Sequence, residues 1–183
     1  LENRNIMKRV IPELFNSYEV NPIDDYPSQL YQCLCDASFS TNQKKTIVVL
    51  TPGVFNSAYF EHSYLAQQMG VELVEASDLY VSRSGNVLMK TINGPKKIDV
   101  IYRRVDDIYL DPKAWLKNST LGIPGIYKSW KSKKISIVNA PGSGVADDKA
   151  VYAYVPKMIK FFLNERPIIS QVKTYVCAIK KDL

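Results

Sequence analysis

TIVVLTPG, at residues 46–53, is the stretch of the chain that decides the fold. Its unbroken series of β-branched and aliphatic residues is typical of a strand buried on both faces of a parallel sheet, and its proline and glycine end the strand. Asn56 or Ser57 can cap a following helix, which Gly70 ends. A short strand at Val71–Glu75 completes a strand–helix–strand unit of the parallel type.

The chain beyond this unit continues to alternate between strand-like and helix-like segments, which turn-forming residues separate. The predicted elements are a hairpin of residues 79–82 and 87–92 around the turn Arg83–Asn86, a strand at 97–104 after the turn Asn93-Gly94, helices at 111–117 and 123–131, a parallel strand at 135–138, a helix at 147–163 that Pro156 bends or interrupts, and a last strand at 168–176. Alternation of this kind predicts a sheet with helices on its faces.

Two amphipathic helices are expected before the first strand, because apolar residues recur at helical spacing in residues 2–18 and again in residues 24–34. The fold class that we predict is α/β: a Rossmann-like three-layer domain with a mostly parallel sheet, a β-hairpin insertion and N-terminal helices. The expected parts are a helical entry segment at 1–45, the Rossmann-like domain at 46–166 and a connecting segment at 167–183.

The composition is that of a globular protein, with 46% hydrophobic and 23% charged residues. No apolar run approaches the roughly 18 residues that a membrane span needs, so we expect a soluble, cytoplasmic protein with no membrane partner. The net charge of +6 comes largely from short lysine pairs rather than from a basic stripe with interleaved aromatics, so no nucleic-acid partner is expected. Three cysteines without a CxxC pair indicate neither zinc nor a disulfide framework.

The loop Thr51–Ser57 leads from the first strand into a helix, where backbone N–H groups can bind an anion. On spacing alone, an ordinary strand-to-helix turn shaped by proline and glycine is the favoured interpretation. The loop contains neither a GxGxxG pattern nor a P-loop lysine, so dinucleotide binding and P-loop chemistry are disfavoured.

Charge gathers in Arg103-Arg104-Val105-Asp106-Asp107, at the carboxyl end of a predicted strand, where ligands of open α/β sheets bind. Consecutive strand residues face opposite sides, so one arginine should point into the crevice and the other toward solvent or a helix. A guanidinium can hold a substrate carboxylate through two parallel hydrogen bonds. A local salt-bridge cluster is an equal alternative, and a metal site is weaker because adjacent carboxylates on an extended chain diverge.

Two other features invite a functional interpretation. The glycines of Gly142-Ser143-Gly144 allow a phosphate to approach the backbone, and Lys149 can reach the same ligand, although the residues alone predict only a loop and a helix cap. His62 is the only histidine. It is expected on a helix surface or at an interface, because a pairing with a cysteine or serine nucleophile cannot be read from the sequence.

Four segments resemble, in the same order, the circularly permuted ATP-grasp family, whose members often carry the name glutathionylspermidine synthase. They are VVLTPGVFNSAYFEHSYLAQQMGVELVEASDL (48–79), KTINGPKKIDVIYRRVDDIYLDP (90–112), LGIPG (121–125) and NAPGSGVADDKAVYAYVPKMIKFFL (139–163). The resemblance covers nearly the whole chain. It implies a fold similar to the substrate-binding domain of eukaryotic glutathione synthetase, and thus a carboxylate–amine ligase that uses ATP and Mg²⁺ to activate a carboxylate for attack by an amine.

The resemblance also implies roles for individual residues. Arg104 would bind a substrate carboxylate with help from Asn56 on the opposite loop, whereas Asp107 stands where glutathione synthetase has a tyrosine, which implies a different substrate. Lys149 matches a lysine that contacts ATP in that enzyme. The residues expected to bind substrate are Arg104, Asn56, Ser57, Arg103 and Asp107, and those expected to bind ATP are Lys149, Gly142, Ser143 and Gly144.

The segment departs from the family in having neither its magnesium ligands nor its second ATP lysine, and Leu1-Glu2-Asn3-Arg4 looks like the middle of the family sequence. We therefore expect the substrate-binding part of a ligase, inactive alone, that binds a small-molecule or peptide carboxylate. The remainder of the parent chain would be its partner, and ATP and Mg²⁺ would act in the full-length parent. The alternatives are a non-catalytic peptide- or protein-binding module derived from such a ligase and, less favoured, a stand-alone nucleotide-binding protein.

Overall fold

The computed structural model describes residues 1–182, which form two compact units divided after Val138. The first unit contains both β-sheets and six of the seven α-helices found among the described residues, and the second begins at Asn139. Each unit is described by itself below. The division predicted from the sequence, at residues 45 and 166, stays a prediction.

A parallel sheet of four strands forms the centre of the first unit, with the strand order β2-β1-β6-β7. Leu50 pairs with Val74 on one side and with Arg103 on the other, so these strands end at a common edge. The strands are β1 (Ile47–Leu50), β2 (Glu72–Val74), β6 (Val100–Arg103) and β7 (Ser136–Val138). The predicted parallel sheet is confirmed.

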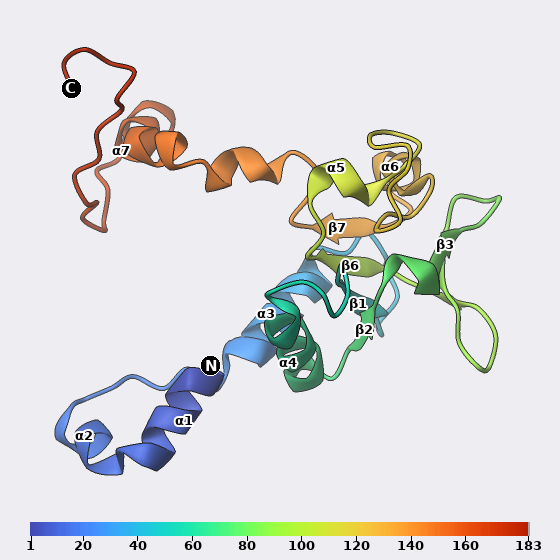
Figure 1. The fold of residues 1–183 in the computed structure, drawn as a ribbon, viewed down its shortest axis with the longest axis horizontal. Helices are drawn as coiled ribbons and strands as arrows, with labels where there is room; N and C mark the ends of the chain where they lie inside the picture. The colour runs from blue at the N-terminus through green and yellow to red at the C-terminus, as the bar shows by residue number, and fades with distance from the viewer. Residues whose placement is uncertain (183) are drawn as a thin grey trace. The chain divides into compact units, whose positions relative to one another are not determined.

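The two faces of this sheet are covered by different helices (Figure 1), as the alternation of strand side chains requires. Val48, Leu50 and Ile101 share one apolar cluster with residues of α5 (Asp107–Leu110) and α6 (Ile126–Lys131). Val49, Val100 and Tyr102 belong to a second cluster, together with residues of α3 (Tyr26–Asp36) and α4 (Tyr59–Met69). The predicted three-layer arrangement is therefore confirmed.

A small antiparallel sheet forms the expected hairpin insertion. It follows the 3-10 turn η1 (Ala76–Asp78) and consists of β3 (Leu79–Val81), β4 (Val87–Met89) and β5 (Lys96–Lys97). The prediction of one continuous strand at 97–104 is wrong. Lys96–Lys97 pairs with β4, whereas Val100–Arg103 pairs with β1 and β7 in the parallel sheet.

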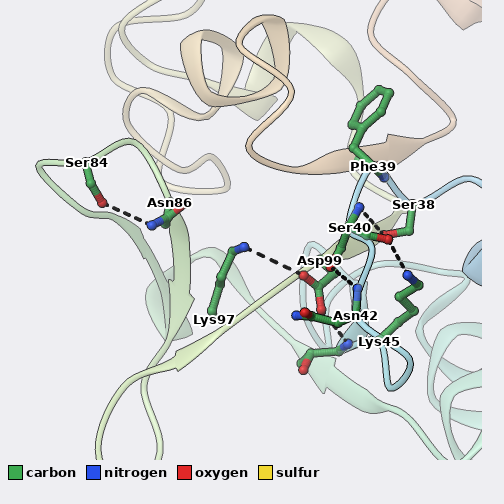
Figure 2. Close-up of polar contacts among 11 residues, drawn as sticks. Ser38, Phe39, Ser40, Asn42, Lys45, Ser84, Asn86, Lys97 and Asp99 are labelled. Carbon is green, nitrogen blue, oxygen red and sulfur yellow. Dashed lines mark hydrogen bonds and ion pairs between the residues drawn. The ribbon is translucent and has the colours of Figure 1, made fainter.

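Asp99 holds the start of β6 in place at the amino-terminal edge of the parallel sheet (Figure 2). Its buried carboxylate accepts a hydrogen bond from the Thr46 amide at 2.9 Å, and its own amide donates to the Thr46 carbonyl at 2.9 Å. The Lys97 ammonium lies 3.9 Å from the same carboxylate. Asp99 therefore separates the segment that joins the hairpin from the segment that joins the core, which explains why the predicted strand is divided.

The first predicted helix, residues 2–18, is two helices: α1 (Glu2–Val10) and α2 (Pro12–Ser17). Ile11 lies between them with φ −132° and ψ 60°, outside helical values. Pro12 has no amide hydrogen, and its ring disfavours a helical conformation of the residue before it, so the break falls there. Apolar residues continue at helical spacing on both sides of this break. The spacing alone therefore could not distinguish one helix from two.

Three other predicted elements differ from the structure. The helix predicted at 111–117 is absent, and α5 ends at Leu110, immediately before it. The helix predicted at 123–131 begins only at Ile126, because Gly125 has φ +91°, outside the helical region. The strand predicted at 168–176 is also absent: residues 164–182 contain no strand, and a strand without a partner would leave its backbone groups unpaired.

The second unit contains the 3-10 turn η2 (Ser143–Asp147) and the helix α7 (Lys149–Leu163). Asp148 caps α7, because its carboxylate accepts a hydrogen bond from the Ala150 amide at 2.8 Å. Pro156 lies inside this helix and does not interrupt it. None of the α-helices within residues 1–182 is both long and apolar enough to cross a membrane.

Asp111 ties together the segments that surround α6. Only 1% of this residue is exposed, and its carboxylate accepts hydrogen bonds from three backbone amides: Lys113 at 2.8 Å, Gly125 at 2.9 Å and Tyr127 at 3.0 Å. The side chain therefore satisfies donors at the start of α6 that the short helix cannot satisfy itself. The Asp111 carbonyl also accepts hydrogen bonds from the amides of Ala114 at 3.0 Å and Trp115 at 2.9 Å, so the chain makes one turn here that does not continue as a helix.

Replacing Asp111 with alanine should lower the free energy of unfolding by about 2–4 kcal/mol, because three amide donors lose a buried, charged acceptor. Urea denaturation followed by circular dichroism measures this change. Asp106→Ala is the matched control, because Asp106 is exposed and its side chain caps nothing, so its effect should stay within about 0.5 kcal/mol. Equal losses in the two variants would show that Asp111 does not anchor this region.

Candidate functional site

The candidate site lies at the carboxyl-terminal edge of the parallel sheet, where a loop at residues 51–58 connects β1 to α4. Gly53 has φ +101°, and a Cβ atom there would lie 3.1 Å from a carboxylate oxygen of Glu75. The positive φ therefore favours glycine at this turn, and any other residue would also have to displace the Glu75 carboxylate slightly. Val54 and Phe55 are exposed at the tip of the loop.

Asn56 and Ser57 lie on this loop but do not cap α4, contrary to prediction. The N-cap residue of α4 is Ala58, which has no side-chain acceptor. The side-chain oxygen Oδ1 of Asn56 instead accepts a hydrogen bond from the Ala58 amide at 2.9 Å, which closes a local turn before the helix. The NH₂ group of the same side chain is a donor that this turn does not use.

Arg103 faces the α5 side of the sheet and is 7% exposed. One of its guanidinium nitrogens lies 2.8 Å from an Asp107 carboxylate oxygen, and another donates to the Val105 carbonyl. These contacts connect β6 to α5 through a buried arginine and a partly exposed aspartate. Both residues were predicted to bind substrate, and the geometry pairs them with each other.

Arg104 extends toward the opposite side, so the two arginines diverge as the strand alternation predicts. Its amide donates to the Leu50 carbonyl at 2.9 Å, which places the residue beside the end of β1. The guanidinium lies 5.8 Å from the centre of the Tyr102 ring and 3.9 Å from a carboxylate oxygen of Glu61. The Arg104 side chain is 30% exposed and that of Glu61 is 68% exposed, so this long ion pair leaves the guanidinium open to a second anion.

His62 is buried, with 2% of the residue exposed, and the prediction that it lies on a helix surface or at an interface is wrong. Its Nδ1 atom lies 2.9 Å from the Thr51 hydroxyl oxygen, which also accepts a hydrogen bond from the Gly53 amide at 3.3 Å. Burial lowers the pKa of His62 below its ordinary value, the positive charge of Arg104 lowers it further, and Glu61 opposes the shift. The neutral imidazole thus links α4 to the loop that carries Asn56.

The residues predicted to bind ATP lie in the second unit. Gly142 has φ +93° and precedes η2, which contains Ser143 and Gly144. Lys149 is the first residue of α7 and is exposed. The structure thus places Arg104, Asn56 and Ser57 at one edge of the first unit, and the predicted nucleotide residues at the start of the second.

No group of three or more histidine, cysteine, aspartate or glutamate residues that could hold a metal ion occurs within residues 1–182. The adjacent Asp106 and Asp107 do not form such a group, because Asp107 is held by Arg103 and Asp106 is exposed at the start of α5.

Comparison with known proteins gives relatives that are longer than this chain. A protein of Synechocystis sp. is 48% identical over 182 residues, which are all of this chain and 38% of that protein. A protein of Mycobacterium tuberculosis is 48% identical over 177 residues, which are 97% of this chain and 32% of that protein. Both bear the name "Uncharacterized protein". The chain thus spans about a third of the length of these relatives.

A third relative has a name that states an activity. The "Putative glutamate–cysteine ligase 2-2" of Frankia casuarinae is 38% identical over 180 residues, which are 97% of this chain and 21% of that protein. Most of the Frankia protein therefore lies outside the matched region, and its name describes that whole protein. The family described as circularly permuted ATP-grasp type 2 matches residues 1–183. Because this match covers the whole chain, the protein belongs to the circularly permuted ATP-grasp family, type 2.

Proposed function

We propose that this chain binds the carboxylate substrate of an ATP-dependent carboxylate–amine ligase. The observation that carries the proposal is the position of Arg104: its guanidinium is partly exposed at the carboxyl-terminal edge of a parallel sheet. Its partners there are both distant, an ion pair with Glu61 at 3.9 Å and a hydrogen bond to the Tyr102 hydroxyl at 3.5 Å. A substrate carboxylate can form two parallel hydrogen bonds with such a group and displace the exposed Glu61. Membership of the ATP-grasp family supports ligase chemistry.

The residues around Arg104 would orient the substrate rather than react with it. The Tyr102 ring, 5.8 Å from the guanidinium carbon, limits the directions that the arginine can take. The Asn56 NH₂ group would donate a further hydrogen bond from the loop, which the Thr51–His62 contact holds against α4. Holding one carboxylate in a fixed orientation for attack is the main contribution that a protein makes to this type of reaction.

ATP with Mg²⁺, which the family generally uses, would supply the phosphoryl group that activates a carboxylate. We infer from the resemblance to glutathione synthetase that Lys149 and the Gly142-Ser143-Gly144 loop contact the nucleotide. The chain spans 38% of the Synechocystis relative, so the proposal places the remaining ATP and Mg²⁺ ligands, and catalysis itself, in a longer protein that contains this chain. A soluble, cytoplasmic location forms part of the same proposal.

The proposed substrate class is a small acidic molecule, such as glutamate or a γ-glutamyl peptide. The name of the Frankia relative includes glutamate, which makes glutamate a reasonable first ligand to test. By the resemblance, Asp107 stands where glutathione synthetase has a tyrosine, and its pairing with Arg103 supports a substrate that differs from that of glutathione synthetase.

Calorimetric titration of the chain with glutamate and a γ-glutamyl peptide tests the role of Arg104. Arg104→Ala should weaken binding by at least about tenfold, the loss expected for a charge-assisted hydrogen bond. Glu61→Gln removes the competing carboxylate and should leave affinity equal or increase it. A peptide whose carboxylates are amidated should not bind.

The outcomes separate the candidate functions. If Arg104→Ala leaves carboxylate binding unchanged and the chain alone binds ATP tightly, the assignment of this chain to the carboxylate substrate is wrong. If carboxylate binding depends on Arg104 but a longer protein with the complete ATP site forms no amide from any acidic substrate, the chain belongs to a non-catalytic binding module instead.

The lowered pKa of His62 predicts a pH dependence of stability. The neutral imidazole is favoured in the folded chain, so its contribution to the free energy of unfolding is present above its ordinary pKa of 6.5 and is lost as the pH falls below that value. His62→Gln should therefore lose less stability than the wild type between pH 7 and about pH 5. NMR titration of the single imidazole measures the pKa directly, and a value above 6.5 would contradict the prediction.

A further inference from the structure

A polar pocket of about 610 Å³ lies between the turn of the β3–β4 hairpin and α6. Its wall includes three basic side chains from three separate segments: Arg83 from the hairpin turn, Lys113 from the segment after Asp111, and Lys128 from α6. None of the residues that carry the carboxylate proposal above lines it. The pocket is therefore a second candidate site within the first unit.

The positive charge of this pocket is not neutralised by nearby acids. Arg83, Lys113 and Lys128 have no ion pair within 4.0 Å in the part of the chain that the structure describes. Asp111 is the one acidic residue that lines the pocket among the residues described, and both its oxygens already accept backbone hydrogen bonds. Three cations and one aspartate give the residues that line the pocket a net charge of about +2.

Hydrogen bonds fix the segments that carry these cations. In the hairpin turn the Ser82 amide donates to the Asn86 carbonyl at 2.8 Å, and the Asn86 side chain donates to the Ser84 hydroxyl at 3.1 Å (Figure 2). Asp111 binds the amides of Lys113 and Tyr127, the residue before Lys128. The backbone positions of all three cations are thus set before a ligand arrives, which lowers the cost of binding.

The hairpin turn also offers a hydroxyl donor. The Ser82 and Ser84 hydroxyl oxygens lie 2.9 Å apart, so one donates to the other. Each oxygen also accepts a hydrogen bond from Asn86. One of the two hydroxyl hydrogens is therefore left to donate to a ligand, next to the Arg83 guanidinium.

We propose that this pocket binds a phosphate group, either as free phosphate or as part of a small phosphate ester. A phosphate presents several acceptor oxygens in different directions, which suits cations that come from three segments and a hydroxyl donor. A carboxylate has two oxygens in one plane and needs only one guanidinium. The proposal does not rest on the ligase function, because the two sets of residues are separate.

Amide NMR spectra of the chain, recorded during titration at fixed ionic strength with inorganic phosphate and then with adenosine monophosphate, test this proposal. The amides of Gly85, Lys113 and Gly125 should shift in a saturable manner. Arg83→Ala and Lys128→Ala should each weaken phosphate binding by at least about tenfold. Tighter binding of the nucleotide than of phosphate would identify an ester as the ligand, and equal binding would identify the phosphate group itself.

Lys96→Ala is the matched control, because it removes one exposed positive charge from the same antiparallel sheet outside the pocket. It should change the affinity by less than about twofold, the level of long-range screened charge effects. An equal loss in Lys96→Ala, shifts that do not saturate, or shifts spread over the surface would overturn the proposal. Citrate that binds as tightly as phosphate would overturn the choice of phosphate.

Discussion

The parallel pairing of β1 with β6 is the constraint on which the candidate carboxylate site depends. It sets Leu50 opposite Arg103 and places the Arg104 amide on the Leu50 carbonyl. The alternation of strand side chains then sends the two adjacent arginines to opposite sides. A shift of the pairing by one residue would exchange their environments, burying Arg104 beside α5 and exposing Arg103. The register is protected because both faces of the sheet are buried.

The same edge of the sheet combines a rigid support with an exposed loop. Thr51 and His62 hold the base of the loop to α4, while Val54 and Phe55 remain exposed at its tip. Burial lowers the pKa of the His62 imidazole, and the positive charge of Arg104 lowers it further. The positive charge of Arg104 that would attract an anion therefore also favours the neutral form of His62. The same imidazole contacts Thr51 and so helps to hold the loop.

The sequence predicts this architecture well where local patterns carry the information. β1 could be identified because a continuous β-branched run between polar segments is typical of a buried strand, and Gly70 ends α4 in the left-handed conformation that a glycine favours. The misjudged elements depend on distant partners instead. Asp111 resembles a local helix start, yet two of its hydrogen-bond donors lie 14 and 16 residues further along the chain. No local pattern reveals such a partner.

The candidate site shows the same limit. The spacing of Arg103 and Arg104 predicted that they diverge, but only packing decides which of them meets Asp107 and which stays open. The burial of His62 was missed, because the helical pattern of α4 does not say that its inner face meets Thr51. A usable signal was the position of Thr51, a polar residue directly after a buried strand, which needs a hydrogen-bond partner from the next helix.

The net charge of +6 likewise takes on meaning only through the environment of each cation. Arg103 is neutralised by Asp107 and serves packing, whereas Arg104 has a distant, exposed partner and remains able to attract an anion. Arg83, Lys113 and Lys128 come from segments that are far apart in sequence, and only the fold gathers them around one pocket. The number of basic residues alone therefore says little about which ligands a protein binds. A guanidinium paired with a carboxylate of the same chain stabilises the fold, whereas one without a close carboxylate can bind an anionic ligand.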